Sequence, residues 1–394
     1  MSIAAAVIAL SFLVFFHELG HFIAAKLLGV GVLEFSIGMG PRLISRVYRN
    51  TRYSLKLLPL GGSCAMLGED DAGSGDFTAA RGQDLTDGSA EWRDFDGVKF
   101  RNSDVEKYSF QNKAAWKRFI ICIAGVLNNF ILALVLSAVV IAATGFDLPY
   151  VVSTQEGTPA AEAGFKEGDR LTGISMDGKN GKKIDSFRDL YLWLYIYSGD
   201  FKDDTDIRMT YIRDGARQSV SIHPYYAADA GKYKLGISFF NGRVAADSPK
   251  QFLLDTWYEV RYNISIVFDS FKMLAAGKVH RNEVMGPVGA VSVMGSTVQE
   301  SSKYGVANAA IVLAELCVML SSNLGVMNLL PIPALDGGRL LFILLEMISR
   351  RRLNPRLEEK INEVGMILLL IFMALIMGND IMNLFTGAYK SIGG

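Results

Sequence analysis

His17, Glu18 and His21 are the residues of this 394-residue chain whose types and spacing point most directly to chemistry. The two histidines are four residues apart, so a helix places both imidazoles on one face. Two neutral imidazoles on one helix face bind zinc, and the adjacent Glu18 lies close enough to hold and deprotonate a metal-bound water. The pattern predicts metal-assisted hydrolysis of peptide bonds.

The setting of this motif is apolar. Residues 2–16 carry no charge and residues 22–25 continue the apolar run, which predicts one membrane-spanning helix over residues 1–25. A five-residue pattern also arises by chance on a soluble surface, but ionisable groups in hydrocarbon are costly unless they are used. The segment has no basic start, and the charged motif interrupts its far end. We therefore expect a retained helix and not a cleaved signal peptide.

The composition limits the remaining possibilities. Half of the residues are hydrophobic, which is typical of a membrane bundle with small folded modules. Lysine plus arginine number 40, as do aspartate plus glutamate, so we expect no nucleic-acid partner. Three widely separated cysteines, Cys64, Cys122 and Cys317, predict neither a disulfide framework nor a Cys-x-x-Cys zinc site.

Three further apolar stretches, residues 119–143, 306–330 and 361–377, are each near the length of a membrane span. The expected fold class is therefore a polytopic α-helical membrane protein with about four transmembrane helices. Their predicted limits are residues 1–25, 116–145, 305–349 and 361–388.

Basic residues gather in the loops after the first span, before the second, and between the third and fourth. By the positive-inside rule these loops are cytoplasmic, so residues 146–304 lie outside. The residues concerned are Lys26, Arg42, Arg46, Arg49, Arg52, Lys113, Lys117, Arg118, Arg350, Arg351, Arg352 and Arg356.

Residues 26–115 are predicted to form a membrane-associated β-hairpin region and a loop on the cytoplasmic side. Apolar and polar residues alternate near residues 35–62, and Gly38 and Gly40 permit turns. An edge strand near the metal is able to pair with an extended peptide, although an ordinary hairpin fits the pattern as well. Residues 70–112, rich in Asp, Gly, Ser and Asn, are expected to be a solvated loop.

Residues 150–240 are predicted to form a domain of short strands with a short helix, outside the membrane. The strands 207–213 and 218–223 flank an Asp-Gly turn, and the pattern resembles a PDZ domain of the bacterial kind. Such a domain binds extended peptides or chain ends by adding a strand to its sheet. A small β-rich spacer without a ligand is the alternative.

The following extracytoplasmic region, residues 248–304, contains apolar residues at helical spacing with charges between them. This predicts an amphipathic helix near residues 250–277. The helix either lies at the outer membrane surface or packs on the neighbouring domain.

A catalytic zinc needs a third protein ligand and an open position for water. Pro331 and Pro333 interrupt the third span just before Asp336 and leave this carboxylate near the cytoplasmic side. The first span, entering from outside, reaches the same side at its histidines, so topology brings Asp336 to the depth of the metal. The alternative for Asp336 is a helix cap or turn residue.

Side-chain amides also lie in the apolar helices. Asn128 and Asn129 are in the second span, and Asn323 and Asn328 are in the third. Amides there satisfy freed backbone groups or grip an extended substrate. For Asn128 and Asn323 we favour interhelical hydrogen bonds.

Over nearly its full length the chain resembles the site-2 protease family of intramembrane zinc metalloproteases, in particular the bacterial branch that cleaves anti-sigma factors. The stretch 17–21 matches the family's His-Glu-x-x-His motif, and Asp336, in Leu-Asp-Gly-Gly, matches its third zinc ligand. Residues 36–43 and 57–62 resemble its β-hairpin region, which includes Gly38 and Gly40. Residues 124–130 resemble a family motif in which Val126 replaces a proline.

The resemblance implies zinc as cofactor, His17, His21 and Asp336 as its ligands, and Glu18 as the catalytic base. It implies substrate handling by Asn129 and Asn328, and we extend this expectation to Gly38 and Gly40 in the hairpin. It also implies regulated intramembrane proteolysis in the bacterial inner membrane, with the active site toward the cytoplasm.

The partners expected from the resemblance are single-span membrane proteins such as anti-sigma factors, and remnant signal peptides. A site-1 protease acts first on the outer part of the substrate, and the PDZ domain serves as a size filter. Two other functions fit the composition: a catalytically idle scaffold, and a zinc transporter or sensor. The intact Glu18 argues against the first, and the apolar second and fourth spans argue against the second.

Overall fold

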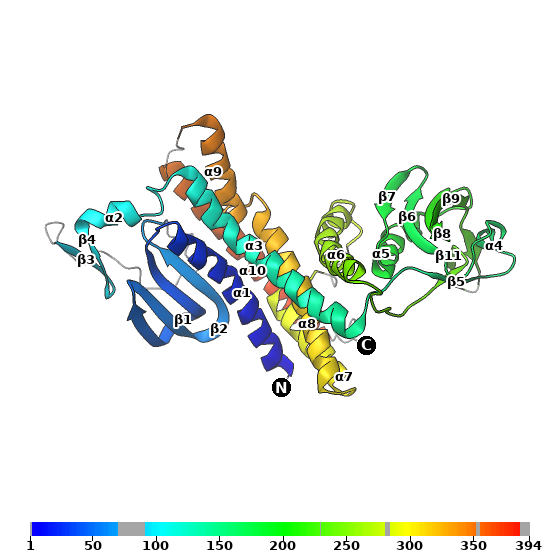
Figure 1. Cartoon of the computed structure of the whole chain (residues 1–394), viewed down its shortest axis with the longest axis horizontal. Coiled ribbons are helices and arrows are strands. Elements are labelled where there is room, and N and C mark those ends of the chain that lie inside the picture. Colours follow the sequence, from blue (N-terminus) through cyan, green and yellow to red (C-terminus); the bar gives the residue numbers. More distant parts are fainter. Residues whose placement is uncertain (1, 70–90, 229, 280–283, 352–354, 387–394) are drawn as a thin grey trace. The chain divides into compact units, whose positions relative to one another are not determined.

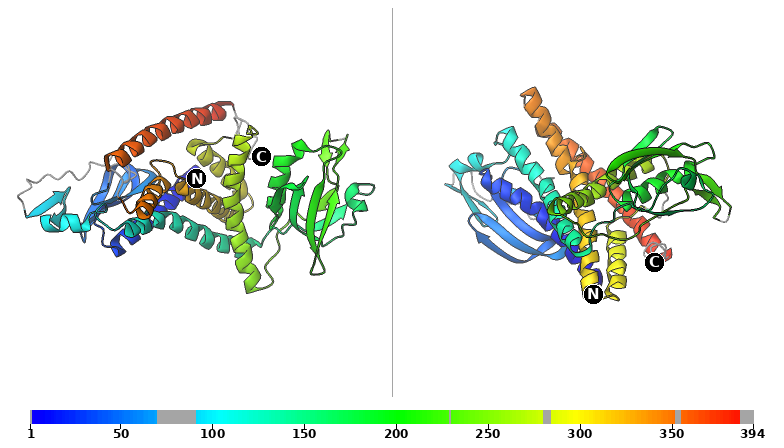
Figure 2. Two further views of the ribbon diagram at one scale, coloured as in Figure 1. Left: turned by 90° about the horizontal axis from the view of Figure 1, so that it is seen from above. Right: turned by 45° about the vertical axis from the view of Figure 1, so that its right-hand side comes forward.

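The computed structural model of the chain describes residues 2–69, 91–228, 230–279, 284–351 and 355–386. It consists of two compact units. One unit contains residues 1–136 and 280–394, and the other contains residues 137–279, so the boundary falls within a single long helix. Figure 1 shows the elements of both units, and Figure 2 gives two further views.

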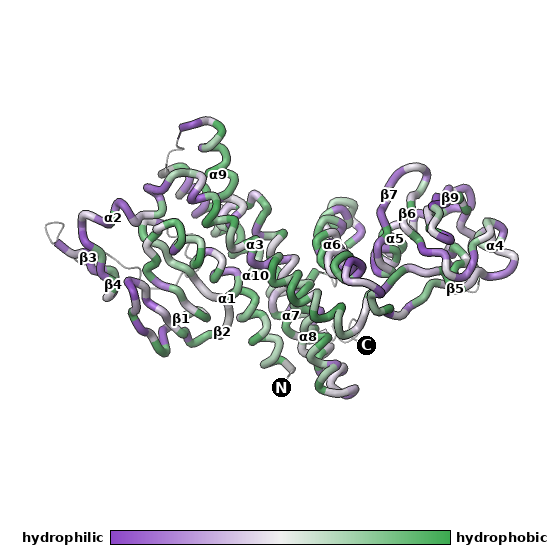
Figure 3. Tube along the Cα trace, viewed as in Figure 1, coloured by the Kyte–Doolittle hydropathy of each residue, from purple (hydrophilic) through white to green (hydrophobic). Residues whose placement is uncertain are grey.

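The first unit contains the candidate membrane-spanning helices. Four helices among the described residues are long and apolar enough to cross a membrane, at Ile3–Leu27, Ala115–Thr144, Val306–Leu329 and Lys360–Thr386. Figure 3 shows the apolar character of these helices. The predicted count of four spans is confirmed, although residues 387 and 388 of the last predicted span lie outside the described residues. The helices are α1 (Ser2–Leu27), α2 (Asn102–Tyr108), α3 (Ala115–Thr144), α7 (Pro287–Ser302), α8 (Val306–Leu329), α9 (Asp336–Ser349) and α10 (Pro355–Thr386).

The predicted segment 305–349 divides into two helices. Helix α8 ends at Leu329, and α9 starts at Asp336 after a connection that contains two prolines. Proline cannot continue a helix, and Ala334 between them and α9 has a φ of 71°. Asp336 therefore stands at the first position of a new helix and not inside the third span.

The predicted region 248–304 also divides, because its two helices belong to different units. Helix α6 (Pro249–Ala275) is part of the second unit, whereas α7 packs against α1 and α8 in the first. Asp380 of α10 is buried and accepts hydrogen bonds from the backbone N–H groups of Gly286 and Gly289, at 2.9 and 2.8 Å. The last span thus caps the start of α7.

Two long strands, β1 (Val32–Tyr48) and β2 (Thr51–Met66), form a sheet beside α1. Both strands fold back on themselves, at Gly38, Gly40 and Gly61, which have φ values between 80° and 87°. Residues 34–37 consequently pair with residues 62–65 on one side and with residues 52–55 on the other. Residues 61–66, which we call the edge arm, have one strand neighbour among the described residues and lie next to α1.

A buried polar cluster holds the fold-back of this sheet. The Glu34 carboxylate accepts hydrogen bonds from Arg42, at 2.7 Å, and from Ser54, at 2.5 Å, and lies 3.6 Å from Lys56 Nζ. Burial alone would raise the pKa of Glu34, but the hydrogen bonds from Arg42 and Ser54 outweigh it and hold the pKa below its usual value. The charged Glu34 side chain therefore links the first part of β1 to the second part of β1 and to the first part of β2.

The segment after residue 90 is ordered secondary structure, in contrast to the solvated loop expected over 70–112. It contains β3 (Trp92–Phe95), β4 (Val98–Arg101) and α2. Val98 and Phe100 are buried against Leu67, and this apolar pair outweighs the polar composition around it. Residues 70–90 of the expected loop lie outside the described residues.

The second unit is an α+β domain that contains the predicted range 150–240, of which residue 229 lies outside the described residues. Its main sheet has the antiparallel order β7-β6-β8-β9, and a second pair joins β5 to β12. Its core contains the buried Leu190, Trp193, Ile207 and Met209. The elements are β5 (Val151–Thr154), α4 (Pro159–Glu162), β6 (Arg170–Met176), β7 (Lys179–Lys183), α5 (Phe187–Tyr197), a 3-10 turn (Ser198–Asp200), β8 (Ile207–Arg213), β9 (Ala216–Ile222), β10 (Tyr225–Ala227), β11 (Lys232–Lys234), β12 (Ile237–Phe239) and α6.

Helix α6 is amphipathic, as its periodicity predicts, but its polar face is the covered one. Glu259 of α6 binds Arg188 of α5, which also binds Asp147 at 2.9 Å. Asp269 of α6 lies 2.9 Å from Lys182 of β7. Apolar side chains of α6, including Trp257 and Phe268, are exposed. The helix therefore packs on its own domain through charges and presents an apolar face outward.

Candidate active site

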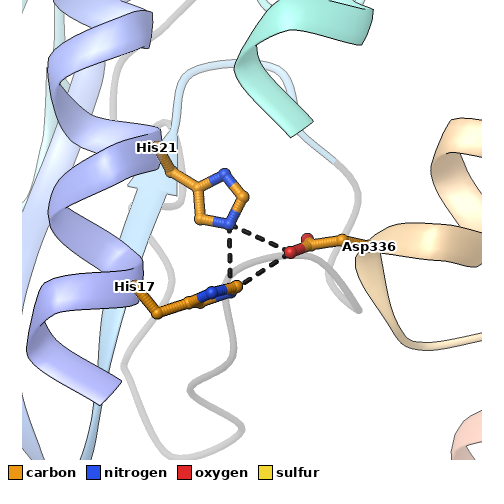
Figure 4. Close-up of side chains that lie close together, drawn as sticks. All are labelled: His17, His21 and Asp336. Atoms are coloured by element: carbon orange, nitrogen blue, oxygen red, sulfur yellow. Dashed lines mark hydrogen bonds and ion pairs between the residues drawn. The ribbon is translucent and has the colours of Figure 1, made fainter. Parts of the chain in front are cut away.

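Two histidines of α1 and the first residue of α9 meet at one point (Figure 4). The Nε2 atoms of His17 and His21 are 3.2 Å apart. Asp336 Oδ2 lies 3.1 Å from the first and 3.2 Å from the second. Four ligands at the corners of a zinc tetrahedron, with bonds of about 2.0–2.1 Å, stand about 3.3 Å apart. The spacing and the donor types of these three groups fit a zinc ion.

The backbone of α3 determines which ring nitrogen of His21 is free to bind a metal. His21 Nδ1 lies 2.9 Å from the carbonyl oxygen of Ile121. A carbonyl only accepts, so Nδ1 carries the proton and Nε2 presents its lone pair to the other two ligands. A hydrogen bond of this kind orients a metal-binding imidazole and raises its basicity.

The side-chain amide of Asn129 plays the same part for His17. It is completely buried and lies 3.0 Å from His17 Nδ1. For His17 Nε2 to bind a metal, Nδ1 must donate its proton, so the amide oxygen must be the atom that faces the ring. Asn129 Oδ1 has no hydrogen-bond partner within the described part of the chain. Rotation of the amide by half a turn gives it one, the N–H group at His17 Nδ1.

The three ligand groups line a cavity of about 290 Å³. Glu18 lines it beside them, as do Asn328, Met39, Gly62, Cys64 and Cys122. Asn328 Nδ2 lies 3.5 Å from His17 Nε2. A β-carbon at Gly62 would lie 3.5 Å from Glu18 Cγ, which shows how closely the edge arm approaches the carboxylate. The cavity thus combines a metal-ligand set, a carboxylate and the edge of a strand.

The remaining predicted residues do not all reach this cavity. Gly38 and Gly40 do not line it, and their positive φ angles instead form the bend that carries Met39 into it. Asn129 lies behind His17, away from the cavity. Asn128 donates to the carbonyl of Phe16 in the neighbouring helix, as interhelical bonding predicts.

Sequence reasoning did not single out Gly125, Glu69 or Arg339. A β-carbon at Gly125 would lie 2.2 Å from His21 Nε2, so only glycine leaves room for the ring. Gly125 precedes Asn129 by one helical turn, so the two residues share a face of α3. This spacing was the signal in the sequence that could have placed Gly125 near the histidines. Glu69 and Arg339 form a buried ion pair at the cavity, and no local pattern links two residues so far apart in the sequence.

Comparison with known proteins gives one consistent result. The model of peptidase family M50 matches residues 5–372. A candidate zinc metalloprotease of Fusobacterium nucleatum is 34% identical over 391 residues, which cover 98% of this chain and 100% of the relative. The zinc metalloprotease RasP of Geobacillus kaustophilus is 28% identical, over 98% of each chain. The regulator of sigma-W protease RasP of Bacillus subtilis is 27% identical, over 98% of this chain and 99% of its own.

The match covers α1 with its two histidines, the start of α9 and most of α10 in one family model. It confirms the resemblance to site-2 proteases, for which the zinc-binding pattern in α1 was the first indication. The chain belongs to peptidase family M50 and is a multi-pass membrane metalloprotease that uses zinc.

Proposed function

We propose that this chain cleaves the transmembrane segments of single-span proteins in regulated intramembrane proteolysis. The observation that carries the proposal is the convergence of His17, His21 and Asp336 beside Glu18 at a helix that is apolar enough to span a membrane. A scaffold needs no carboxylate at this position. A transporter needs polar groups through several spans, and no described feature favours one.

In this proposal His17, His21 and Asp336 would hold zinc. Bound zinc supplies Lewis-acid activation of the attacking water and of the scissile carbonyl. Glu18 lines the same cavity, takes the proton from the water and delivers it to the departing amine. Ile121 and Asn129 keep each imidazole in the tautomer that the ligand role needs.

The substrate binds in an extended form, because a helical backbone hides its carbonyl groups in internal hydrogen bonds. The edge arm, residues 61–66, pairs with it as an additional strand, since this arm has one neighbour in the described sheet and borders the cavity. Asn328, within reach of His17, contacts the substrate near the scissile bond. Gly38 and Gly40 act on the substrate through the bend that presents Met39.

Anti-sigma factors and remnant signal peptides are the proposed substrate classes. The Bacillus subtilis relative is named for regulation of sigma-W, and this name supports the first class. The basic loops support an orientation in the bacterial inner membrane with the active site toward the cytoplasm and residues 146–304 outside.

The second unit is proposed to be a PDZ domain that limits the size of approaching substrates after a site-1 protease has acted. A cavity of about 560 Å³ lies between α5 and β12 and is lined by Tyr191, Leu235 and Gly236 among others. Strand β12 pairs with β5 on one side only within the described sheet, so its other edge is available to an extended peptide.

The test co-expresses the wild type or the Glu18→Gln variant with single-span candidate substrates. We expect the wild type to produce a zinc-dependent cut within the span and Glu18→Gln to produce none while still binding zinc. Equal cutting by the two forms would refute the proposal. A parallel measurement of bound zinc in Asp336→Ala tests the ligand set, because unchanged zinc affinity would remove Asp336 from it.

A further inference from the structure

A buried ion pair joins two walls of the metal cavity. The Arg339 Nη1 and Glu69 Oε1 atoms are in direct contact, and the side chains are 10% and 2% exposed. Both residues line the cavity that holds the ligand set. Neither is a metal ligand in the geometry described above.

Such a pair contributes little to stability for its own sake. Burying two charges removes both from water, and the attraction between them often does no more than offset this penalty. The best-attested use of a buried pair is to fix how two elements sit against each other.

At one end, Glu69 is attached to the edge arm. Its Oε2 atom accepts the backbone N–H of Met66, at 3.1 Å, and Met66 is the last residue of β2. Met66 pairs with Val32, and Leu67 N donates to Gly31 O at 2.7 Å. The Glu69 carboxylate is thus held at a set position relative to the strand.

At the other end, Arg339 lies one helical turn after Asp336 on α9. The N-cap residue of α9, Leu335, makes no side-chain capping bond, and the preceding connection contains two prolines. Contacts that α9 makes further along therefore help to hold the start of this helix, and with it Asp336, in place. Arg339 supplies one such contact, and through Glu69 it links α9 to the end of the edge arm.

We infer that Glu69 and Arg339 are positioning residues that set the register between a strand-paired substrate and the metal ligands, and so decide which peptide bond is cut. This inference rests on the proposed function. Successive residues of an extended chain are about 3.3 Å apart. A shift of the edge arm by that distance relative to α9 would present the neighbouring peptide bond to the same metal.

The chain contains a matched control pair on the same helix. Arg118 of α3 and Glu346 of α9 form an ion pair of 2.6 Å, with side chains 7% and 19% exposed. This pair also anchors α9, but it does not line the metal cavity. Disrupting it tests the effect of a loosened α9 without the link to the edge arm.

The experiment maps the cut in a single-span substrate by mass spectrometry for the wild type, Glu69→Gln, Arg339→Gln, Arg339→Lys and Arg118→Gln. Bound zinc and the melting temperature are measured for each. We expect one principal cut from the wild type and from Arg118→Gln. The Glu69 and Arg339 variants should retain zinc and cut at neighbouring bonds as well, with the smallest spread for Arg339→Lys, which keeps the cation.

A single unshifted cut in the Glu69 and Arg339 variants, with activity lowered only in proportion to stability, would overturn the inference. Loss of zinc from Glu69→Gln at an unchanged melting temperature would also overturn it. For a variant that gives no product, a photo-reactive residue in the substrate is crosslinked to the edge arm. A shifted crosslink supports the inference and an unshifted one opposes it. Absence of cutting by the wild type would instead reject the proposed function.

Discussion

At Gly125 the backbone of α3 passes so close to His21 that a β-carbon would lie 2.2 Å from Nε2 and 2.6 Å from Cε1. Gly125→Ala must therefore move the imidazole or separate α1 from α3. A misplacement of about 1 Å at a reacting centre costs about 100-fold in rate. We expect Gly125→Ala to lose bound zinc and at least about 100-fold in peptidase activity, measured by metal analysis and substrate cleavage.

Gly378 provides the control for this substitution. It lies within α10, and a β-carbon there would meet nothing within 4 Å. Alanine at an open helical position is favoured over glycine by about 1 kcal/mol, so Gly378→Ala should keep full zinc content and activity. Equal behaviour of the two variants would show that space around the His21 ring is not what Gly125 provides.

Asn129 gives a second prediction at this scale, because its amide faces His17 Nδ1 from behind. Leucine has a similar volume and no hydrogen-bonding group. Asn129→Leu should lower zinc affinity or activity by about 10–100-fold, as loss of such supporting hydrogen bonds does in other metal sites. Competition with a chelator measures the affinity. Asn308→Leu, at an exposed position on α8, should leave the affinity unchanged, and a similar loss there would point to a general effect of the substitution.

At the scale of the elements, long apolar periodicity made α1, α3, α8 and α10 predictable from the sequence. The role of Asp336 as the third ligand was also predictable, because the two prolines and the number of spans placed its carboxylate at the depth of the histidines. The fold-back of β1 and β2 was not predictable, since residue 34 pairs with both residue 52 and residue 65. Periodicity identified α6 as amphipathic but not which face is covered, because its partners, such as Arg188, lie on another helix.

The exposed face of α6 carries the prediction that belongs to this scale. Leu253, Trp257, Phe268, Phe271 and Leu274 are all exposed, whereas Glu259 and Asp269 are buried in ion pairs with their own domain. An apolar helix face of this kind binds the interface of a lipid bilayer. We propose that α6 lies on the outer membrane surface and that brominated lipids quench the fluorescence of Trp257.

The quenching of Trp257 is obtained as the difference in fluorescence between the wild type and Trp257→Phe in vesicles. A Phe268→Ser and Phe271→Ser double variant should reduce the quenching, because it removes apolar area from the same face. Trp193, which is 1% exposed in the core of the second unit, provides a reference, because the difference between the wild type and Trp193→Phe should show no quenching by lipid. Quenching that is the same in all variants would place the face of α6 away from lipid.

For the whole molecule, the main physical consequence of the architecture is that two cores of different kinds share one chain. The membrane unit depends on helix packing and close glycine contacts, whereas the second unit has its own apolar core around Trp193 and Met209. The charged contacts of Arg188 with Asp147 and Glu259 lie within that unit. Thermal unfolding should therefore show a transition of the second unit that responds separately to substitutions within it.

The pair of Asp169 and Arg213 makes this separation measurable through pH. Burial alone would raise the pKa of Asp169, but hydrogen bonds from Arg213 and from the backbone N–H of Lys166 outweigh it and hold the pKa below its usual value. A carboxylate with a lowered folded-state pKa stabilises the fold above its unfolded pKa, which is about 3.9. This contribution is lost as the pH falls through the folded-state pKa of Asp169.

The gap in melting temperature between the wild type and Asp169→Asn should hence be largest above about pH 5 and shrink below about pH 4. Asp214→Asn, at an exposed turn, should produce no such gap. A gap that does not change with pH, or one that appears equally in the transition of the membrane unit, would contradict the ionic role of Asp169 or the independence of the two units.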